Sequence, residues 1–293
     1  MSQTPAPPVE LTRPPRTEPT GIVQFVRLEA TEHAWEIAPG TIVRGYGYNA
    51  QVPGPTLEAT VGDTLLVRFT NSLAEATTLH WHGLRLPHSG GVAVQPSAAV
   101  PPGGTVERRL ELPDAGTFWY HPHVGHTQRS DFGMYGALVV RDPVEPVVDG
   151  ERVLFLGCLK PAGPAPDAPT PVPQDTDGGA RDLLLVNGVR EAQMLVSAGQ
   201  RERWRMVNAG TRSLRLSLSG QTLRVVSSDS GLRAAPVEVD AVLLGPGERR
   251  DVVTGPFSAG QSLTLNVQPC HLGSGRSHRR RIATLHVAGP VSV

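Results

Sequence analysis

Apolar and polar residues alternate along most of the chain from Gly21 onward, with the period of two that an extended strand produces. Residues 21–37, GIVQFVRLEATEHAWEI, alternate in this way and end at the turn-forming sequence APG. No long segment shows the apolar period of a helix. Further strand-like segments are separated by Gly, Pro, Asn and Ser, and they cover 64–73, 78–86, 106–113, 116–124 and 134–143. This pattern predicts an all-β protein, either a sandwich or a barrel.

The strand pattern restarts after residues 142–152, which predict a linker, and the second series resembles the first. VGDTLLVRFTNS (61–72) aligns with AGQRERWRMVNA (198–209) at an offset of 137 residues. Continuing the alignment with a short gap sets TTLHWHG (77–83) against RSLRLSL (212–218), and PPGGTVERRLEL (101–112) against GPGERRDVV (245–253). We therefore predict two copies of one β-domain.

The predicted boundaries place one copy at 21–143 and the other at 151–289. Residues 1–20 are rich in proline and predict a disordered or extended tail. Residues 161–180 are too polar and too rich in proline to pack, so we expect a mobile loop there.

Composition narrows the classes of partner. Lys plus Arg and Asp plus Glu are equal at 27 each, which gives no electrostatic reason to expect nucleic acid or an anionic membrane. No apolar run reaches the length of a membrane span. The N-terminus lacks the apolar segment of a signal peptide. The sequence therefore does not determine the cellular compartment of the protein. Cys158 and Cys270 predict buried free thiols, with one disulfide as the alternative.

Four of the ten histidines lie in two His-x-His pairs, His80 with His82 and His121 with His123. Residues i and i+2 of a strand point to the same face, so each pair projects together. If the two strands are neighbours, four imidazoles converge on one pocket. Neutral imidazole binds copper, zinc, iron and nickel, and four buried imidazoles without a metal would pay a desolvation cost. The pattern therefore predicts a metal site.

Trp81, Trp119 and Tyr120 flank these pairs, and we expect them to form a dry wall around the site. The alternative to a metal site is that the four histidines are core or surface residues that share hydrogen bonds. In the second copy, Arg215 and Ser217 stand opposite His80 and His82, so the shared fold does not require the histidines.

We predict surface or structural roles for the remaining histidines. His126 and His88 are expected at the surface, with a position at the edge of the metal site as the alternative. His33, His278 and His286 are expected to be structural or solvated. The adjacent pair Cys270 and His271 could serve copper, although Pro269 precedes it and no histidine or methionine follows at a suitable spacing. The basic run RSHRRR at 276–281 predicts a solvated hairpin tip, with a partner site as the alternative.

The segments LHWHGLRLP and GTFWYHPHVGHTQRSDFGMYGALVVRDP resemble the first cupredoxin domain of the multicopper oxidases, which are laccase-like enzymes. The second half, from NGVREAQMLVSAGQRERWRMVNAG to LLGPGERRDVV, looks like the second domain of the same family, and together the resemblance covers about residues 21–289. It implies two tandem cupredoxin-like Greek-key β-sandwiches, a copper cofactor and a periplasmic or secreted location.

Carried over by motif, His80 resembles the type 2 copper ligand, and His82, His121 and His123 resemble type 3 ligands. The resemblance implies that dioxygen and a small reducing substrate, a phenolic or metal-ion donor, are the reactants. The family's other four cluster histidines and its blue-copper Cys, His and Met lie in motifs that this sequence does not contain. Gly90 stands where many relatives have an acid that assists proton delivery.

These departures leave two functional hypotheses. In the first, a third cupredoxin domain, a partner subunit or a homo-oligomer completes an oxidase. In the second, the chain is a non-catalytic copper-binding or scaffold protein derived from such an oxidase.

Overall fold

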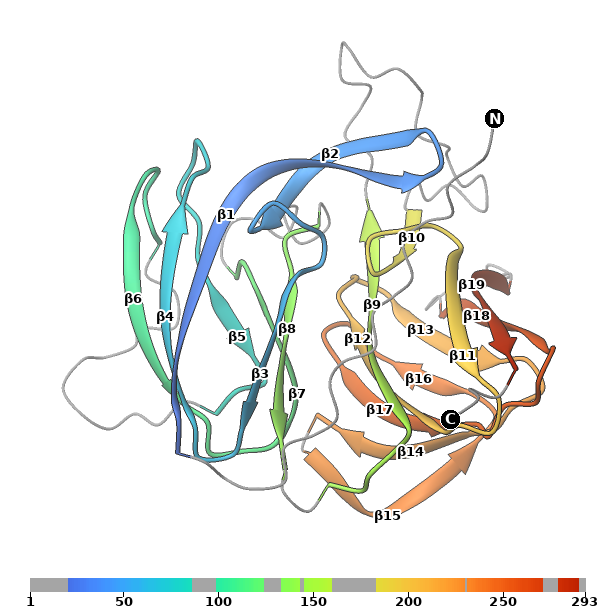
Figure 1. The fold of residues 1–293 in the computed structure, drawn as a ribbon. Coiled ribbons are helices and arrows are strands. Elements are labelled where there is room, and N and C mark those ends of the chain that lie inside the picture. Colours follow the sequence, from blue (N-terminus) through green and yellow to red (C-terminus); the bar gives the residue numbers. More distant parts are fainter. Residues whose placement is uncertain are drawn as a thin grey trace.

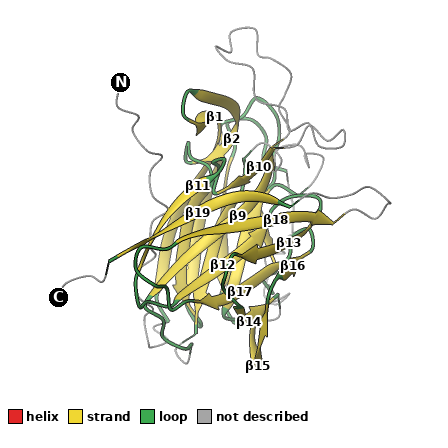
Figure 2. Cartoon of the chain, turned by 90° about the vertical axis from the view of Figure 1, so that its right-hand side faces the viewer, coloured by secondary structure: helices red, strands yellow, loops and turns green. Residues whose placement is uncertain are grey.

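The structure is a computed structural model and describes residues 21–85, 99–123, 133–142, 145–159, 183–229, 231–270 and 279–289. Every regular element within these ranges is a strand, and the strands form two β-sandwiches packed against each other (Figures 1 and 2). The prediction of an all-β fold is therefore confirmed. In the described part of the chain, no helix has the length and apolar character needed to cross a membrane.

The first sandwich consists of two four-stranded sheets, ordered β2-β1-β4-β6 and β3-β8-β7-β5. Its core lies between them and includes Leu28, Phe69, Trp81, Leu110 and Tyr120, because alternate residues of each strand face inward. The strands are β1 (Val23–Ala38), β2 (Thr41–Tyr48), β3 (Gly54–Thr60), β4 (Thr64–Asn71), β5 (His80–His82), β6 (Thr105–Glu111), β7 (Gly116–His121) and β8 (Gly136–Arg141).

The second sandwich consists of a six-stranded sheet, β10-β9-β12-β17-β14-β15, and a five-stranded sheet, β11-β19-β18-β13-β16. Its core includes Trp204, Leu216, Val252 and Leu265. The strands are β9 (Gly150–Leu159), β10 (Leu183–Val186), β11 (Ala192–Ser197), β12 (Glu202–Asn208), β13 (Ser213–Leu218), β14 (Leu223–Ser228), β15 (Gly231–Val239), β16 (Val242–Leu244), β17 (Arg249–Thr254), β18 (Ser262–Cys270) and β19 (Arg280–Ala288).

Backbone pairing supports the predicted internal repeat. Strand β4 pairs parallel with β1 and antiparallel with β6, and β12 pairs in the same two ways with β9 and β17. Asn71 and Asn208 end the two central strands with the same hydrogen bonds. Each side-chain amide donates to the carbonyl four residues later and accepts from the N–H two residues later. The offset of 137 residues therefore continues past both asparagines.

This continuation corrects the placement of the short gap in the predicted alignment. Asn71 and Asn208 also donate to the carbonyls of Val100 and Leu244, and the strand partners of these two residues, Thr77 and Leu214, are again 137 residues apart. The residues that replace His80 and His82 are thus Ser217 and Ser219, not Arg215 and Ser217, because no gap separates this strand from Asn208. The second copy still lacks the histidines.

Several predictions concern residues for which the structure gives no description. The tail at 1–20 and the loop at 161–180 lie outside the described residues. The boundaries at 143 and 151 remain predictions, since residues 143 and 144 are also outside. Cys158 carries a thiol that is half-buried, not fully buried as predicted, and the side chain of Cys270 is not described.

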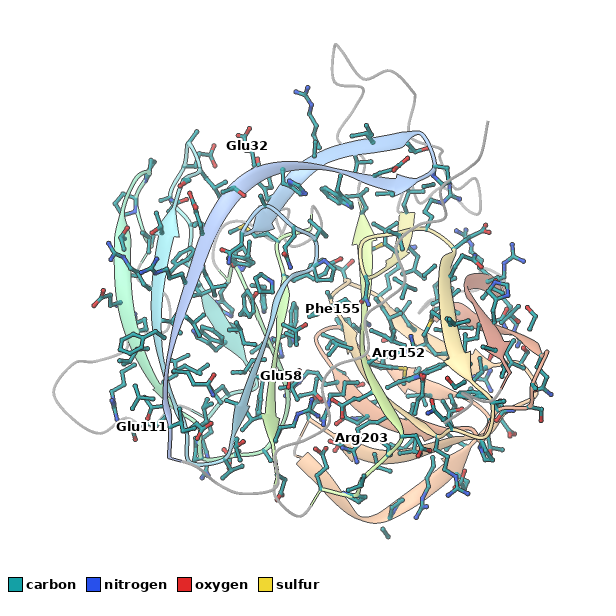
Figure 3. All side chains as sticks on the ribbon, viewed as in Figure 1. Glu32, Glu58, Glu111, Arg152, Phe155 and Arg203 are labelled. Atoms are coloured by element: carbon teal, nitrogen blue, oxygen red, sulfur yellow. The ribbon has the colours of Figure 1, made fainter. Side chains whose placement is uncertain are left out.

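The sandwiches meet through an apolar cluster. Trp119, Tyr135, Ala137 and Val139 of the first pack against Val153, Phe155, Val207 and Ala209 of the second. Figure 3 labels Phe155 and Arg203 on the side of the second sandwich that faces the first. The strand ERWRMVN over Glu202–Asn208 is consequently buried on both faces.

A buried ionic network continues this interface. The Arg205 guanidinium, which has no solvent-exposed surface, lies 2.8 Å from Glu145, 2.9 Å from Glu151 and 2.8 Å from Asp251. Thr117 of the first sandwich donates a 2.8 Å hydrogen bond to Asp251. Arg141 and Arg203 pair with the same carboxylates. Arg141 and Thr117 join the first sandwich to this network, and because buried charges are costly unless they are paired, docking of the two sandwiches completes the pairing.

The network predicts an acid-sensitive stability difference for Glu151→Gln. Burial alone would raise the pKa of Glu151, but Arg205 and Arg141 hold it below its usual range. A lowered folded pKa means that the ionised carboxylate stabilises the fold above about pH 4.5, and that this stabilisation is lost as the pH falls through the folded value. We expect the variant to lose about 3 kcal/mol of unfolding free energy at neutral pH and much less at about pH 3.

Urea unfolding of both proteins at the two pH values measures this difference. Glu111→Gln is the control, because Glu111 forms only an exposed pair with Arg109, and such pairs contribute little. A loss for Glu151→Gln that does not change with pH would contradict the electrostatic explanation.

Candidate metal centre

The antiparallel pairing of β5 with β7 brings the predicted histidines together. His80 is the register partner of His121, and His82 is the partner of Trp119. The ring centroids of His80 and His82 are 5.8 Å apart, and those of His80 and His121 are 5.3 Å apart. The His-x-His spacing therefore places both side chains of β5 on the face that His121 shares.

One nitrogen from each of His80, His82 and His121 lies within 4.8 Å of the others, in an arrangement that could hold a metal ion. The Nδ1 of His82 and the Nε2 of His121 are 3.3 Å apart. Two nitrogens about 2.0 Å from one ion are separated by this distance at a near-tetrahedral angle. These three residues thus fit a metal that accepts imidazole, such as copper. The assignment of His80, His82, His121 and His123 as ligands stays a prediction.

A backbone carbonyl determines which ring nitrogen of His121 can bind a metal. Its Nδ1 lies 2.7 Å from the carbonyl oxygen of Pro122, which can only accept a hydrogen bond. The ring proton is therefore on Nδ1, which leaves the lone pair of Nε2 facing His82. A carbonyl that holds the distal N–H of an imidazole in this way is a common support for a metal ligand.

His123 lies at the exposed edge of the cluster. It follows the end of β7, and its backbone N–H donates a 2.8 Å hydrogen bond to Thr78. Its ring centroid is 4.5 Å from that of His80 and 6.5 Å from that of His121. The structure brings His123 next to His80 but does not place it among the three closest nitrogen donors.

Burial keeps the three inner imidazoles neutral. Desolvation, with a smaller effect of His123, lowers the pKa of His80 to about 4. Desolvation and then the Arg249 charge lower the pKa of His82 to about 4. Burial lowers the pKa of His121 to about 3, against the opposing effect of its bond to Pro122. At neutral pH all three rings are in the form that binds metal ions.

Only one of the three predicted aromatic residues lines the cluster. Trp119 stacks on His121 with centroids 4.0 Å apart and on His82 at 5.0 Å. Trp81 and Tyr120 pack on each other in the core of the first sandwich. The prediction for these two was wrong, because they alternate with the histidines and face the opposite side of the sheet.

The second sandwich also contacts the cluster, which the sequence analysis missed. A Cβ at Gly247 would lie 2.9 Å from Cε1 of His82, and a Cβ at Gly83 would lie 2.0 Å from Nη2 of Arg249. The Arg249 Nε donates a 2.9 Å hydrogen bond to the carbonyl oxygen of Thr117 in β7. Nothing in the segment GPGERR indicated that its turn would reach the first sandwich.

The other described histidines have the structural or solvated roles predicted for them. His33 stacks on Trp35 with centroids 6.2 Å apart, and His286 bonds to Gln193 at 2.8 Å in an exposed position. Arg281 forms an exposed pair with Glu191 at the start of β19. The predictions for His88, Gly90, His126, His271 and His278 fall outside the described residues.

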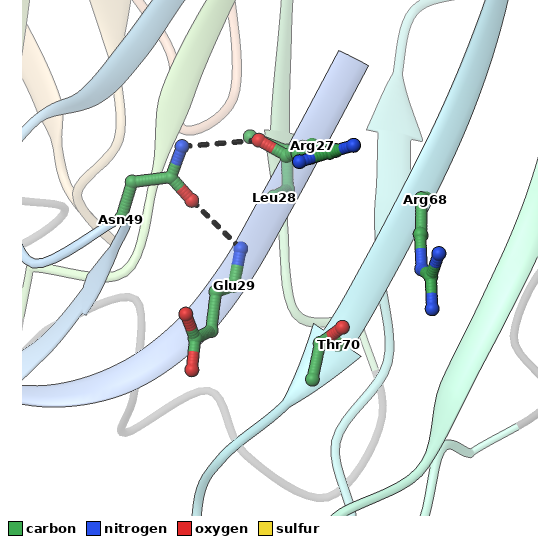
Figure 4. Close-up of a pocket in the computed structure, with 6 residues that line it drawn as sticks. All are labelled: Arg27, Leu28, Glu29, Asn49, Arg68 and Thr70. Atoms are coloured by element: carbon green, nitrogen blue, oxygen red, sulfur yellow. Dashed lines mark hydrogen bonds between the residues drawn. The ribbon is translucent and has the colours of Figure 1, made fainter. Parts of the chain in front are cut away.

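A separate groove lies on the outer face of the other sheet of the first sandwich (Figure 4). Arg27 and Arg68, which are exposed register partners in β1 and β4, line it with Leu28, Glu29, Asn49 and Thr70. Asn49 is engaged with the backbone, since it donates to the Arg27 carbonyl and accepts from the Glu29 N–H. We interpret this groove as a feature of the solvated surface.

Two family models match the chain, and both are described as multicopper oxidase. The first matches residues 29–145, and the second matches residues 163–271. The two ranges correspond to the two sandwiches and together cover more than half of the sequence.

Curated relatives cover the same region. The chain is 36% identical over 246 residues to the multicopper oxidase MmcO of Mycobacterium tuberculosis. The aligned region covers 73% of this chain and 48% of that protein. It is 30% identical to the multicopper oxidase mco of Staphylococcus epidermidis, over 77% of this chain and 52% of that protein. The chain thus spans about half the length of these relatives.

Solved structures agree with the fold. A multi-copper oxidase from Pseudomonas thermotolerans superposes with a TM-score of 0.75 at 31% identity, covering 92% of this chain and 65% of that one. The blue copper oxidase from Nitrosomonas europaea superposes with a TM-score of 0.70, covering 91% of this chain and 86% of that one. At 23% identity, the second comparison supports the fold alone.

Proposed function

This chain belongs to the multicopper oxidase family, and we propose that it binds copper through His80, His82, His121 and His123 as part of an oxidase that uses dioxygen. The observation that carries the proposal is the convergence of three imidazole nitrogens within 4.8 Å on one face of paired strands. In this proposal His80 is a type 2 ligand, and the other three are type 3 ligands.

Bound copper would supply one-electron redox chemistry and a binding site for oxygen. The chain's own residues would fix the geometry of that site. The Pro122 carbonyl holds the His121 proton on Nδ1 and so presents Nε2. Trp119, which is 4% exposed, covers the rings of His82 and His121 and limits water on that side. Ligands that are already oriented lose little entropy when a metal binds.

Four histidines are half of the set that the family resemblance implies for a complete cluster. We propose that a further cupredoxin domain, a partner subunit or a second copy of this chain supplies the rest. The exposed position of His123 supports this, because its ring is open to an incoming ligand group. The electrons would come from a small phenolic or metal-ion donor that binds near a blue copper site outside the printed sequence.

A second candidate function is copper binding without catalysis. It is favoured by Pro122, which puts no cysteine between His121 and His123, and by the spacing after Cys270 and His271, where no histidine or methionine follows at a distance suited to a blue copper site. In this case the three inner imidazoles would hold copper for storage or delivery.

Metal analysis and electron paramagnetic resonance of copper-loaded protein, together with oxygen uptake on a phenolic donor, separate these functions. The oxidase proposal predicts bound copper with a non-blue imidazole spectrum, and oxygen consumption once the completing domain or subunit is present. Bound copper without oxygen consumption in that complete assembly would favour the second function. Failure to retain copper after dialysis would contradict both.

A further inference from the structure

We propose that the turn between β16 and β17, residues 245–248, together with Arg249 at the start of β17, positions His82, so that metal affinity depends on docking of the second sandwich. The inference rests on the proposed function for the identity of the ligand. Its structural part, that this turn fixes the orientation of the His82 ring, does not depend on any metal.

The first step is the contact between Gly247 and the imidazole. A Cβ at Gly247 would lie 2.9 Å from Cε1 of His82, 3.3 Å from Nε2 and 3.8 Å from Nδ1. The turn therefore occupies the space beside the Nε2–Cε1 edge of the ring. The opposite nitrogen, Nδ1, is the one that lies 3.3 Å from Nε2 of His121. This arrangement presents Nδ1 to the cluster.

The second step is the rigidity of the turn. The Gly247 N–H donates to the Asn208 carbonyl at 2.9 Å, and the Gly245 N–H donates to the Glu248 carboxylate at 2.6 Å. Gly247 has a φ of +76°, a conformation that favours glycine. A turn held by these bonds cannot easily move away from His82.

The third step is the attachment of the turn to the histidine strands. The Arg249 side chain is 5% exposed, and it lies 2.5 Å from the Asp229 carboxylate. Its Nε donates to the Thr117 carbonyl in β7, and its Nη2 fills the space beside Gly83, directly after β5. One guanidinium from the second sandwich thus contacts both strands that carry the cluster.

The internal repeat shows that the fold itself does not need this contact. The equivalent turn of the first sandwich contains Gly103, whose N–H donates to the Asn71 carbonyl as that of Gly247 donates to Asn208. Gly103 has nearly the same φ, +71°, but a Cβ there would meet nothing within 4 Å. Gly103→Ala therefore matches the backbone strain of Gly247→Ala without the contact to the histidine.

The experiment compares Gly247→Ala, Gly103→Ala and the unmodified chain. We expect both variants to lower the melting temperature, because both place alanine at a positive φ, and Gly247→Ala to lower it further, because its Cβ also meets the His82 ring. Copper affinity measured by competition with a chelator should fall about 10-fold or more in Gly247→Ala only, as it does when the support of a metal ligand is removed. In the metal-free proteins, nitrogen-15 spectra of the imidazoles should show the His82 signals shifted in Gly247→Ala and unchanged in Gly103→Ala.

Arg249→Gln is the second variant and keeps the test decisive if Gly247→Ala fails to fold. It removes the guanidinium without inserting atoms beside His82, and we expect the same shift of the His82 signals and weaker copper binding. Unchanged His82 signals and wild-type copper affinity in the folded variants would overturn the inference. If the unmodified chain binds no copper, the proposed function fails, while the metal-free spectra still decide whether the turn orients His82.

Discussion

Replacing both His82 and His121 by alanine is expected to abolish stoichiometric copper binding, with a loss of affinity on the order of 100-fold or more. Removing one supporting group near a metal already costs about 10–100-fold, and this variant removes two of the three closest donors. The remaining rings, His80 and His123, cannot close a site alone. Copper content after dialysis, measured by elemental analysis, checks the result.

The fold should tolerate this replacement, because the second sandwich keeps the same strand pairing with Ser219 and Asn266 at the equivalent positions. We expect the free energy of unfolding to change by about 1 kcal/mol or less. His286→Ala is the matched control, since that exposed ring bonds only to Gln193 among the hydrogen bonds described for it. Equal copper retention by the double variant and the control would remove these histidines from the site.

Replacing Arg205 by methionine is expected to cause the largest loss of stability. It would remove the cation that Glu145, Glu151 and Asp251 share, so that Arg203 and Arg141 would have to neutralise three buried carboxylates. Removing one partner from a buried ion pair costs about 3–5 kcal/mol, because the remaining charge is not solvated. In a protein of this size the melting temperature should fall by roughly 10 °C.

The internal repeat provides the control for this variant as well. Arg68 occupies the position in β4 that Arg205 occupies in β12, but it is exposed beside the groove of Figure 4. Arg68→Met should change the free energy of unfolding by about 0.5 kcal/mol or less. If calorimetry gave the two variants similar melting temperatures, the buried network would not stabilise the docked sandwiches.

The comparison of these two arginines shows where sequence patterns stop being informative. The sequences TLLVRFTN and ERWRMVN both alternate in the way that predicts a strand with one face in solvent. In the structure, only the first strand has such a face. The second buries both faces because its charged side meets the first sandwich. Alternation identifies which residues share a face, but it does not say whether water or another domain covers that face.

The histidine cluster was predictable to a similar extent. The period of two was enough to predict that His80 and His82 project together. That β5 and β7 are neighbours with His80 opposite His121 depends on long-range pairing, which spacing alone does not determine. The contribution of Gly247 and Arg249 was not predictable, since it arises from how two domains dock.

Anomalous diffraction from copper-loaded crystals, recorded above and below the copper absorption edge, tests the central proposal most directly. We predict a copper peak about 2 Å from the ring nitrogens of His121 and His82, with His80 as a further ligand. A copper peak away from these rings, with His82 and His121 still in contact with each other and no metal between them, would contradict the proposal.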